Sequence, residues 1–428
     1  MLEQDRLLKN KQISQTKRQT IDRHNLMDVK TFDVKVQESR LSKEQKEALT
    51  LVFLEQKWYK NFVLNWAEQS SEHRIAKFNT RQTEITKKDK DMNDIPVKIR
   101  YFTAQSRQCL ISRMCSNIKT LHSLKSKKLQ KCGKLKYSKE ERIIDLKQYG
   151  VSHKILSSKR VKIAGMPKTF VVNGLKQFIT LPGIEITNAR LLHRATGYYL
   201  QFVCYIPKPE TAKEKIDEVI GIDFGCSTSF TTSKGEKISA TIPESDRLKR
   251  CQKNLARKVK GSKNWNRERE KLKKEYQKIN NRRNDSANKI VSYFSQYKTV
   301  VIQDEQLQKW HKNGHGKAVQ HSVLGRVKAK LRLKPNTVVL DKYLPTTKFC
   351  ANCGLWHDEL KVWDRTFSCS CGVKMDRDIH AAKNMVWFFE NYVGVGHAKV
   401  KRVEMESILK RIISDKQTLS MKHEAHSL

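Results

Sequence analysis

Two close pairs of cysteines near the C-terminal end constrain the fold of this chain more than any other sequence feature. The first pair stands in CANCG at Cys350 and the second in CSCG at Cys369. Four thiolates hold Zn²⁺ tetrahedrally in structural sites and leave no position for water. The second pair is one residue shorter than the common form, but two facing pairs still suit one ion. The pattern predicts one structural zinc ion held by Cys350, Cys353, Cys369 and Cys371.

The charge of the chain predicts a polyanionic partner. Among 428 residues, Lys and Arg total 86 and Asp and Glu total 44, a formal net charge of +42. Nucleic acid is the expected partner, and an anionic membrane surface is the alternative. There is no apolar run of about 18 residues and no signal-peptide pattern. We therefore expect no membrane partner, a cytoplasmic location at the nucleoid, and metal binding rather than disulfides for the clustered cysteines.

The N-terminal half divides by its patterns. Residues 1–30 are polar and predict a flexible lead or a short helix, and TFDVKV at 31–36 predicts a strand. Helical patterns with a capping box at Ser42 and Gln45 follow within 42–149. Short β-rich runs punctuated by Gly and Pro then predict a small antiparallel barrel or sandwich. Because the early strand needs partners from these runs, the helical stretch between them is interpreted as an insertion.

The C-terminal half begins with an apolar run, EVIGIDFG at 218–225, which predicts a central strand, and a three-strand meander follows from it. The region 247–283 carries sixteen basic residues and three acids, which predicts helices that bind phosphates. Runs at 298–304 and 337–343 predict two more buried strands. Apolar residues within the basic region predict a thin core-facing stripe: Leu248, Leu255, Val259, Leu272, Tyr276 and Ile279.

Three carboxylates stand where a sheet could bring them together. Asp223 ends one buried strand, Glu305 follows another, and Asp378 begins a helix. Charged groups at such places are costly unless they are paired or bind a metal. Carboxylate oxygens suit Mg²⁺, and two such ions about 3.5–4 Å apart can promote phosphodiester hydrolysis. The set therefore predicts a catalytic site with two Mg²⁺ ions.

Each acid also has a simpler reading. Asp223 could cap a turn, Asp304 competes with Glu305, and Asp376 competes with Asp378, which also suits a helix N-cap. Gly225 lacks a Cβ and would let a nucleic-acid backbone approach. The order of the elements, with an acid on the first strand, after a later strand and on the last helix, fits a ribonuclease-H-like sheet.

On these motifs the chain resembles the TnpB family, the transposon-encoded RNA-guided nucleases related to type V CRISPR effectors. The resemblance runs from about Thr31 to Trp387 and is strongest from Glu218 onward. His380 departs from the family, which usually has Asn there, and is interpreted as a local helix or core residue. The motifs that carry the resemblance are GIDFG at 221, IQDEQL at 302, QHSVLGRVKAKL at 320, CANCG at 350, CSCG at 369 and DRDIHAAKNM at 376.

The resemblance implies a multidomain α+β fold: a ribonuclease-H-like (RuvC) nuclease domain with an inserted zinc ribbon, and an N-terminal wedge-like β-barrel with a helical recognition insertion. The family's catalytic acids fall on Asp223, Glu305 and Asp378. The implied parts are a lead at 1–30, a wedge at 31–41 and 150–215, a recognition insertion at 42–149, a nuclease at 216–345 and 376–400, a zinc ribbon at 346–375 and a disordered tail at 401–428.

The implied function is RNA-guided cleavage of DNA. The implied partners are a guide RNA derived from the transposon end, double-stranded target DNA with a short adjacent motif, and a transposase encoded by the same element. Two alternatives stay open, a regulator whose nuclease site has decayed and a transposase that needs no guide. The residues expected to contact nucleic acid are Lys57, Asn61, Arg257, Lys258, Lys263 and Arg267.

Overall fold

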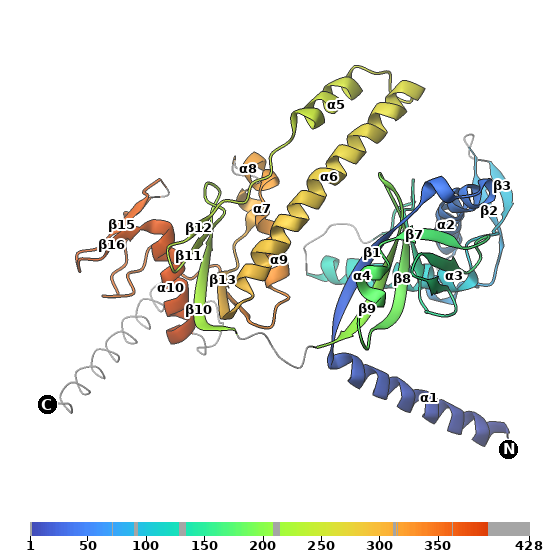
Figure 1. Ribbon diagram of the computed structural model, residues 1–428, viewed down its shortest axis with the longest axis horizontal. Helices are drawn as coiled ribbons and strands as arrows, with labels where there is room; N and C mark the ends of the chain where they lie inside the picture. The colour runs from blue at the N-terminus through green and yellow to red at the C-terminus, as the bar shows by residue number, and fades with distance from the viewer. Residues whose placement is uncertain are drawn as a thin grey trace. The chain divides into compact units, whose positions relative to one another are not determined.

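The computed structural model describes residues 2–70, 72–89, 93–127, 134–208, 215–310, 314, 316–361 and 363–392. The chain forms two compact units, Met1–Thr211 and Ala212–Leu428 (Figure 1). The tail predicted at 401–428 and the end of the nuclease segment, 393–400, lie outside the described residues. Among the residues that the structure does describe, no helix has both the length and the apolar character needed to cross a membrane.

A seven-stranded antiparallel sheet organises the first unit, in the strand order β4-β8-β9-β1-β7-β6-β5 (Figure 1). The long strand β1, Met27–Val36, pairs with β9 on one side and β7 on the other. This confirms that the early strand finds its partners in the later β-rich region. The other strands are β4 (Ile143–Leu146), β5 (His153–Ser157), β6 (Arg160–Ile163), β7 (Phe170–Asn173), β8 (Glu185–Arg194) and β9 (Gly197–Pro207).

Two features of this unit differ from the sequence predictions. Leu2–Asn25 forms helix α1, which replaces the flexible lead and, at 24 residues, is longer than the short helix expected as the other possibility. The segment lacks Gly and Pro and is rich in Leu, Lys, Gln and Arg, which favour helices. Strand β4 lies inside the stretch predicted as a helical insertion. Its alternate residues Ile144 and Leu146 are buried and β4 pairs with β8, so the insertion ends before this strand.

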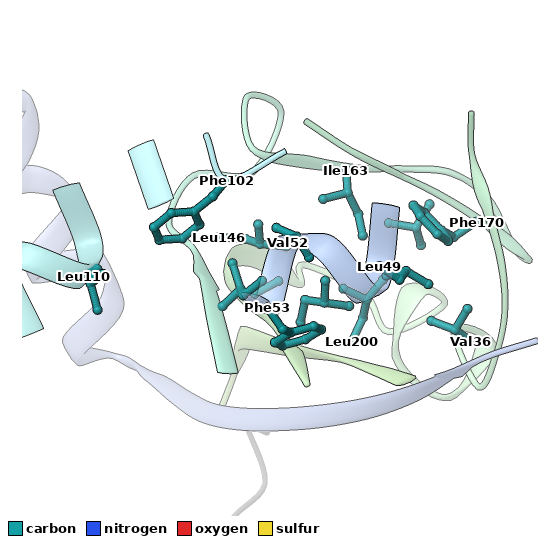
Figure 2. Packing of buried hydrophobic residues seen from close by; sticks show 14 of the residues in the cluster. Val36, Leu49, Val52, Phe53, Phe102, Leu110, Leu146, Ile163, Phe170 and Leu200 are labelled. Atoms are coloured by element: carbon teal, nitrogen blue, oxygen red, sulfur yellow. The ribbon is translucent and has the colours of Figure 1, made fainter. Parts of the chain in front are cut away.

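Helix α2, Lys43–Gln69, covers the core of the first unit and begins at the predicted capping box. The Ser42 hydroxyl accepts from the Gln45 backbone N–H at 3.2 Å, and the Ser42 N–H donates to the Gln45 side chain at 3.1 Å. Such a cap stabilises a helix by about 1 kcal/mol. Figure 2 shows residues of α2 packed among those of the sheet, including Leu49, Val52, Phe53, Val36, Leu146, Ile163, Phe170 and Leu200.

The insertion also contains a hairpin and a second long helix. The hairpin consists of β2 (Glu84–Lys88) and β3 (Asp94–Lys98), and helix α3 spans Ala104–Ser126. The buried Glu55 carboxylate of α2 accepts from three consecutive backbone N–H groups, Arg100, Tyr101 and Phe102, at 2.7–2.8 Å. Charge-assisted bonds of this kind are the strong ones, so they fix the segment after the hairpin on α2. Short helices complete the unit: η1 (Glu38–Arg40), η2 (Ile75–Lys77) and α4 (Lys176–Ile179).

The second unit is built on a five-stranded sheet in the order β12-β11-β10-β13-β14. The first three strands in the chain form the predicted antiparallel meander, and β13 and β14 extend it in parallel. The strands are β10 (Ile216–Phe224), β11 (Phe230–Thr232), β12 (Lys237–Ile238), β13 (Tyr297–Gln303) and β14 (Thr337–Leu340). The helices are α5 (Asp246–Ala256), α6 (Lys263–Phe294), α7 (Leu307–Trp310), α8 (Gly316–His321), α9 (Leu324–Leu331) and α10 (Arg377–Tyr392).

The basic region predicted at 247–283 is two helices, α5 and α6, joined by a turn (Figure 1). The predicted apolar stripe is therefore interrupted. Leu248 and Ile279 are buried, but Val259 lies in the turn and is 79% exposed, and Tyr276 is 40% exposed. Tyr276 is not part of the core because its hydroxyl accepts from the Gln252 amide of α5 at 2.9 Å, which ties the two helices together.

Candidate metal centre and acidic cluster

Parallel pairing of β10 and β13 brings two of the predicted acids to one edge of the sheet. Ile222 pairs with Ile302, so Asp223 lies level with Gln303, and Glu305 follows two residues later. Carboxyl ends of neighbouring parallel strands meet at the same edge, where ligand sites are usual. Asp223 and Glu305 thus leave the sheet on the same side of the molecule.

Helix α10 brings the third acid toward the first. It packs directly on β10 at Gly221, where a Cβ would clash with the backbone carbonyl of Ala382. Asp378 lies one turn before Ala382 on the same helix face, and Asp223 lies two residues after Gly221 on the same strand face. The close approach that Gly221 permits therefore directs Asp378 toward Asp223.

The pKa of Asp223 reflects the charges of both other acids. Burial raises the pKa of Asp223 well above its ordinary value, and the charges of Asp378 and then Glu305 raise it further. Burial also raises the pKa of Glu305, with a smaller contribution from Asp304. Clustered carboxylates with raised pKa values are typical of sites that bind a cation or use a proton. The donor set, all oxygen, fits Mg²⁺.

Asp304 is held apart from this cluster by two basic residues. Lys328, a buried lysine of α9, donates to Asp304 at 2.8 Å and also to the backbone carbonyl of Glu305, and Arg332 donates to Asp304 at 3.0 Å. The hydrogen bond from Lys328 lowers the pKa of Asp304. Asp304 is thus an ion-paired anchor. The charge of Glu305 contributes to the raised pKa of Asp223, whereas the charge of Asp304 does not.

Asp376, rather than Asp378, caps helix α10. The Asp376 carboxylate accepts from the backbone N–H groups of Asp378 at 3.0 Å and Ile379 at 3.2 Å. It also accepts from Lys237 of β12 at 2.7 Å. The N-cap role considered for Asp378 is therefore wrong, because Asp378 lies in the first turn, with Arg377 3.4 Å from its carboxylate. Its side chain remains half-buried beside Asp223.

Gly225 has a local structural role. A Cβ at this position would clash with the carbonyl oxygen of Thr228, within the turn that connects β10 to β11. The tightness of this turn accounts for the glycine, so the expected approach of a nucleic-acid backbone is not needed to explain it.

The four predicted cysteines converge on one point. Their Sγ atoms all lie within 4.8 Å of one another, and among the described residues they are the one group of three or more His, Cys, Asp or Glu side chains that meets this distance. Cys350 and Cys371 are 3.6 Å apart, and Cys353 and Cys369 are 3.4 Å apart. Zn–S bonds of 2.3 Å in a tetrahedron place sulfurs about 3.8 Å apart. The short second pair therefore still fits zinc.

Two similar turns build the cysteine site. The N–H of Gly354 donates to the carbonyl of Cys350 at 2.8 Å, and the N–H of Gly372 donates to that of Cys369 at 3.0 Å. Both glycines have positive φ, 78° and 92°, which other residues rarely adopt. Burial raises the pKa of the Cys369 thiol, but hydrogen bonds, of which that from the Cys371 backbone is the strongest, lower this pKa to about 6. A thiolate is therefore available near neutral pH.

A stack of rings joins the cysteine site to α10. His357 meets the Phe367 ring edge to face at 4.9 Å, and Phe367 stacks on His380 at 3.5 Å. His380 is 3% exposed, and burial lowers its pKa to about 4. The interpretation of His380 as a core residue is confirmed. The Asn384 amide continues the contact by donating to the carbonyls of Thr346 and Phe349.

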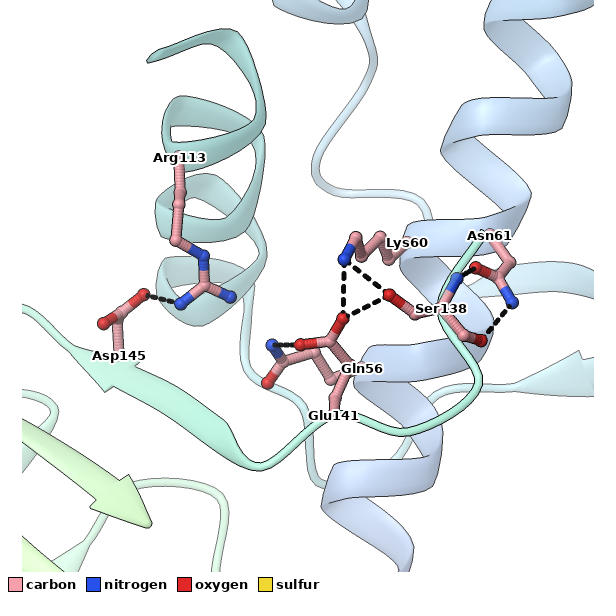
Figure 3. A network of polar contacts seen from close by, with 7 residues as sticks. All are labelled: Gln56, Lys60, Asn61, Arg113, Ser138, Glu141 and Asp145. Atoms are coloured by element: carbon pink, nitrogen blue, oxygen red, sulfur yellow. Dashed lines mark hydrogen bonds and ion pairs between the residues drawn. The ribbon is translucent and has the colours of Figure 1, made fainter. Parts of the chain in front are cut away.

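The expected nucleic-acid contacts fall in both units. Arg257, Lys258, Lys263 and Arg267 are exposed around the turn between α5 and α6. Lys57 lines a pocket beside α2. The Asn61 amide is bonded at both ends to the backbone of Ser138, at 3.0 and 2.8 Å, and it also lines this pocket (Figure 3).

The sequence prediction missed several supporting residues. Asp376 and Asp304 were considered only as competitors of their neighbours, and His357 was not considered. Lys328 lies in the motif QHSVLGRVKAKL among the buried residues Leu324, Val327 and Leu331. A lysine on the apolar face of a short helix is a signal for a buried carboxylate partner, and that signal was present in the sequence.

The sheet, the acids at its edge and the cysteine site together define a mixed α/β protein with a Cys₄ group that could hold a metal ion. The family model OrfB_IS605, described as "Probable transposase", matches residues 201–312, and the model "Cas12f1-like, TNB domain" matches residues 324–385. These two segments contain Asp223, Glu305, the four cysteines and Asp378. Both matches agree with the resemblance of the chain to the TnpB family.

Two curated proteins are similar to part of the chain. A protein of Streptomyces pristinaespiralis named "Putative RNA-guided DNA endonuclease" is 31% identical over 208 residues, which cover 45% of this chain and 50% of that protein. The Escherichia coli K12 protein "Putative RNA-guided DNA endonuclease InsQ" is 26% identical over 216 residues, 44% of this chain and 51% of that protein. The chain thus spans about half the length of the curated relatives it matches.

Proposed function

We propose that this chain is an RNA-guided DNA endonuclease that hydrolyses phosphodiester bonds at the cluster of Asp223, Glu305 and Asp378. The observation that carries the proposal is geometric: the parallel pairing of β10 and β13 brings Asp223 and Glu305 to one edge of the sheet, and α10, which bears Asp378, packs on Gly221 of β10. The raised pKa of Asp223, to which the charges of both other carboxylates contribute, supports it. Without a cation, three such groups repel one another. The names of the two curated relatives support the guided nuclease activity.

The residues have distinct roles in this proposal. Asp223, Glu305 and Asp378 would hold Mg²⁺, and when bound, the metal supplies an activated water and stabilises the leaving oxygen of a phosphodiester. Arg377 offsets part of the negative charge at Asp223. Lys328 fixes the backbone of Glu305, and Asp376 fixes the first turn that carries Asp378.

The sheet order supports a ribonuclease-H-like (RuvC) assignment for the second unit, with an antiparallel meander followed by parallel strands. The Cys₄ site would hold one structural Zn²⁺. The antiparallel sheet of the first unit would be the wedge domain, with α2, the β2–β3 hairpin and α3 as its recognition insertion. The partners in this proposal are a guide RNA from the transposon end, double-stranded DNA and a transposase of the same element.

The basic turn between α5 and α6 supports phosphate binding. Four of its exposed cations are Arg257, Lys258, Lys263 and Arg267, and the two helices that it joins are themselves rich in Lys and Arg. Contacts of this kind are independent of base sequence and weaken as salt rises.

The test begins with RNA that co-purifies with the chain. One enriched structured species, which then directs cleavage of a matching DNA with Mg²⁺, is the expected result. Asp223→Ala should abolish cleavage and leave guide and target binding intact. Binding without cleavage in the unaltered chain would favour the decayed regulator, and cleavage that survives ribonuclease treatment would favour the guide-independent transposase.

A further inference from the structure

A pocket of about 380 Å³ lies in the first unit, whereas the acids and the cysteines described above belong to the second. It is formed by one face of α2, the β2–β3 hairpin and the segment that contains Tyr137. Its floor is aromatic, with Trp58 and Phe62, and both rings are only partly buried. Trp58 thus packs against the core on one side and lines a cavity of ligand size on the other.

Hydrogen bonds hold the wall of this pocket in place (Figure 3). Asn61 binds the Ser138 backbone at both ends of its amide. Lys60 donates to Glu141 at 2.7 Å and to the Ser138 hydroxyl, which in turn donates to Glu141 at 2.7 Å. These bonds fix the segment that carries Tyr137, so the pocket is formed before any ligand binds.

The rim of the pocket is basic. Lys57, Lys87 and Lys88 line it with one acid, Asp94, and Asp94 is paired with Lys88 at 2.9 Å. The Lys87 ammonium lies over the face of the Trp58 ring, 4.4 Å from its centroid. An aromatic floor with a cationic rim matches a group that has a flat ring and a phosphate.

The Lys87 contact is weak enough to be displaced. An exposed cation–π contact is worth about a 2- to 5-fold factor in an equilibrium, whereas a base stacked on an aromatic side chain is worth about 5- to 150-fold. A nucleobase would therefore replace Lys87 on Trp58. The freed ammonium would then lie beside the phosphate attached to that base.

We propose that the pocket at Trp58 and Phe62 binds one unpaired nucleotide, with its base stacked on Trp58 and its phosphates contacted by Lys57, Lys87 and Lys88. Free phosphate would not use the aromatic floor, and an apolar molecule would not use the lysines. The proposal shares its partner class with the proposed nuclease function. The test of the pocket uses neither guide RNA nor Mg²⁺. The pocket proposal can therefore fail while the nuclease proposal holds, and the reverse.

The experiment is photocrosslinking of the full chain to octanucleotides that carry one 5-iodouracil, in DNA and in RNA form, with peptide mapping. The expected crosslink is to Trp58 or Phe62. An unlabelled octanucleotide should compete for it at least about 5-fold better than an abasic octamer of equal charge. Whichever sugar form competes better identifies the nucleic acid that uses the pocket. Crosslinks confined to other segments, or equal competition by the abasic octamer, would overturn the proposal.

Two variants of one tryptophan refine the result. Trp58→Leu should lose the crosslink, and the octanucleotide should no longer compete better than the abasic octamer. Trp58→Phe should keep most of the crosslink and of this difference in competition, since the aromatic face is retained. Trp66→Leu is the matched control. Trp66 lies on the same helix but outside the pocket, stacked on His73 at 4.2 Å. A loss of the crosslink in Trp66→Leu equal to that in Trp58→Leu would show that stacking in the pocket is not its cause.

Discussion

The Phe367 ring stacks on the His380 imidazole with centroids 3.5 Å apart and planes inclined by 11°. Phe367 lies in β15, Thr366–Ser368, two residues before the second cysteine pair begins at Cys369, and His380 lies two residues after Asp378. Strand β15 also pairs with β16, Lys374–Asp376, which ends at the cap of α10. The cysteine site and the first turn of α10 are thus joined both by a stack and by a strand pair.

Substitution of His380 should loosen this junction. His380→Asn, which restores the residue usual in the family, removes the stack and should lower the free energy of unfolding by about 1 kcal/mol or more. A decrease of a few degrees in Tm and faster zinc release to a chelator are the expected results. His122→Asn, an exposed histidine of α3, is the control. Equal Tm and release rates in the two variants would refute the role of the stack.

Zinc content tests the short second cysteine pair. Metal analysis of the purified chain should find about one Zn²⁺ per chain, and Cys369→Ser should lose it because a hydroxyl is a poor replacement for a thiolate. Cys115→Ser, which lies in α3 of the other unit, should keep its zinc. Full zinc content in Cys369→Ser would mean that the ion is held by other residues.

Patterns local to the sequence were the most predictable. The capping box at Ser42, the meander after β10 and the convergence of Cys350 and Cys371 each follow from residue types at short, fixed spacing. The partners of β1 were also predicted correctly, because a lone strand must pair with the later strands available to it. Short-range chemistry sets the cap and the turn of each cysteine pair, whereas the pairing of β1 follows from the need of a lone strand for partners.

Features set by tertiary contacts could not be predicted in the same way. The roles of Asp304 and Asp376 depend on Lys328, which is 24 residues away from the first, and Lys237, which is 139 residues away from the second. The exposure of Val259 depends on where α5 ends, and the stack of His380 depends on strand β15 folding back on α10. The separation of these residues along the chain does not indicate how close they lie in the folded protein.

The buried ion pair of Lys328 should matter to both stability and cleavage. Lys328→Met leaves the Glu305 carbonyl without this donor and Asp304 with Arg332 alone, at an expected cost of about 1.5–3 kcal/mol. Cleavage should fall more than guide binding, because the chain after β13 carries Glu305. Urea unfolding and cleavage rates measure the two effects.

Lys330→Met is the matched control for this variant, since Lys330 lies on the same helix with more exposure. A stability loss confined to Lys328→Met would support the role of Lys328 in anchoring Asp304 and the backbone of Glu305. Equal effects of the two substitutions would show that a general loss of positive charge is responsible.

The raised pKa of Asp223 predicts a pH-dependent stability in the absence of Mg²⁺. Its folded pKa lies above the unfolded value of about 3.9, so ionisation of Asp223 destabilises the fold as pH rises through the folded pKa. Asp223→Asn cannot ionise and should melt higher than the unaltered chain at neutral pH. The difference should shrink as pH is lowered toward about 4, because Asp223 is then protonated in the unaltered chain as well. Thermal melting across this pH range is the measurement.

Mg²⁺ should reverse the order of these two proteins. A cation that binds the folded carboxylates stabilises the unaltered chain by mass action, whereas Asp223→Asn has lost one ligand and should respond weakly. Asp217→Asn is the control, because Asp217 lies on the same strand but is exposed and paired with Lys298 at 2.6 Å. It should keep both the pH dependence and the response to Mg²⁺. If Asp223→Asn melted no higher than Asp217→Asn without metal, the repulsion among Asp223, Glu305 and Asp378 would be too weak to indicate a metal site.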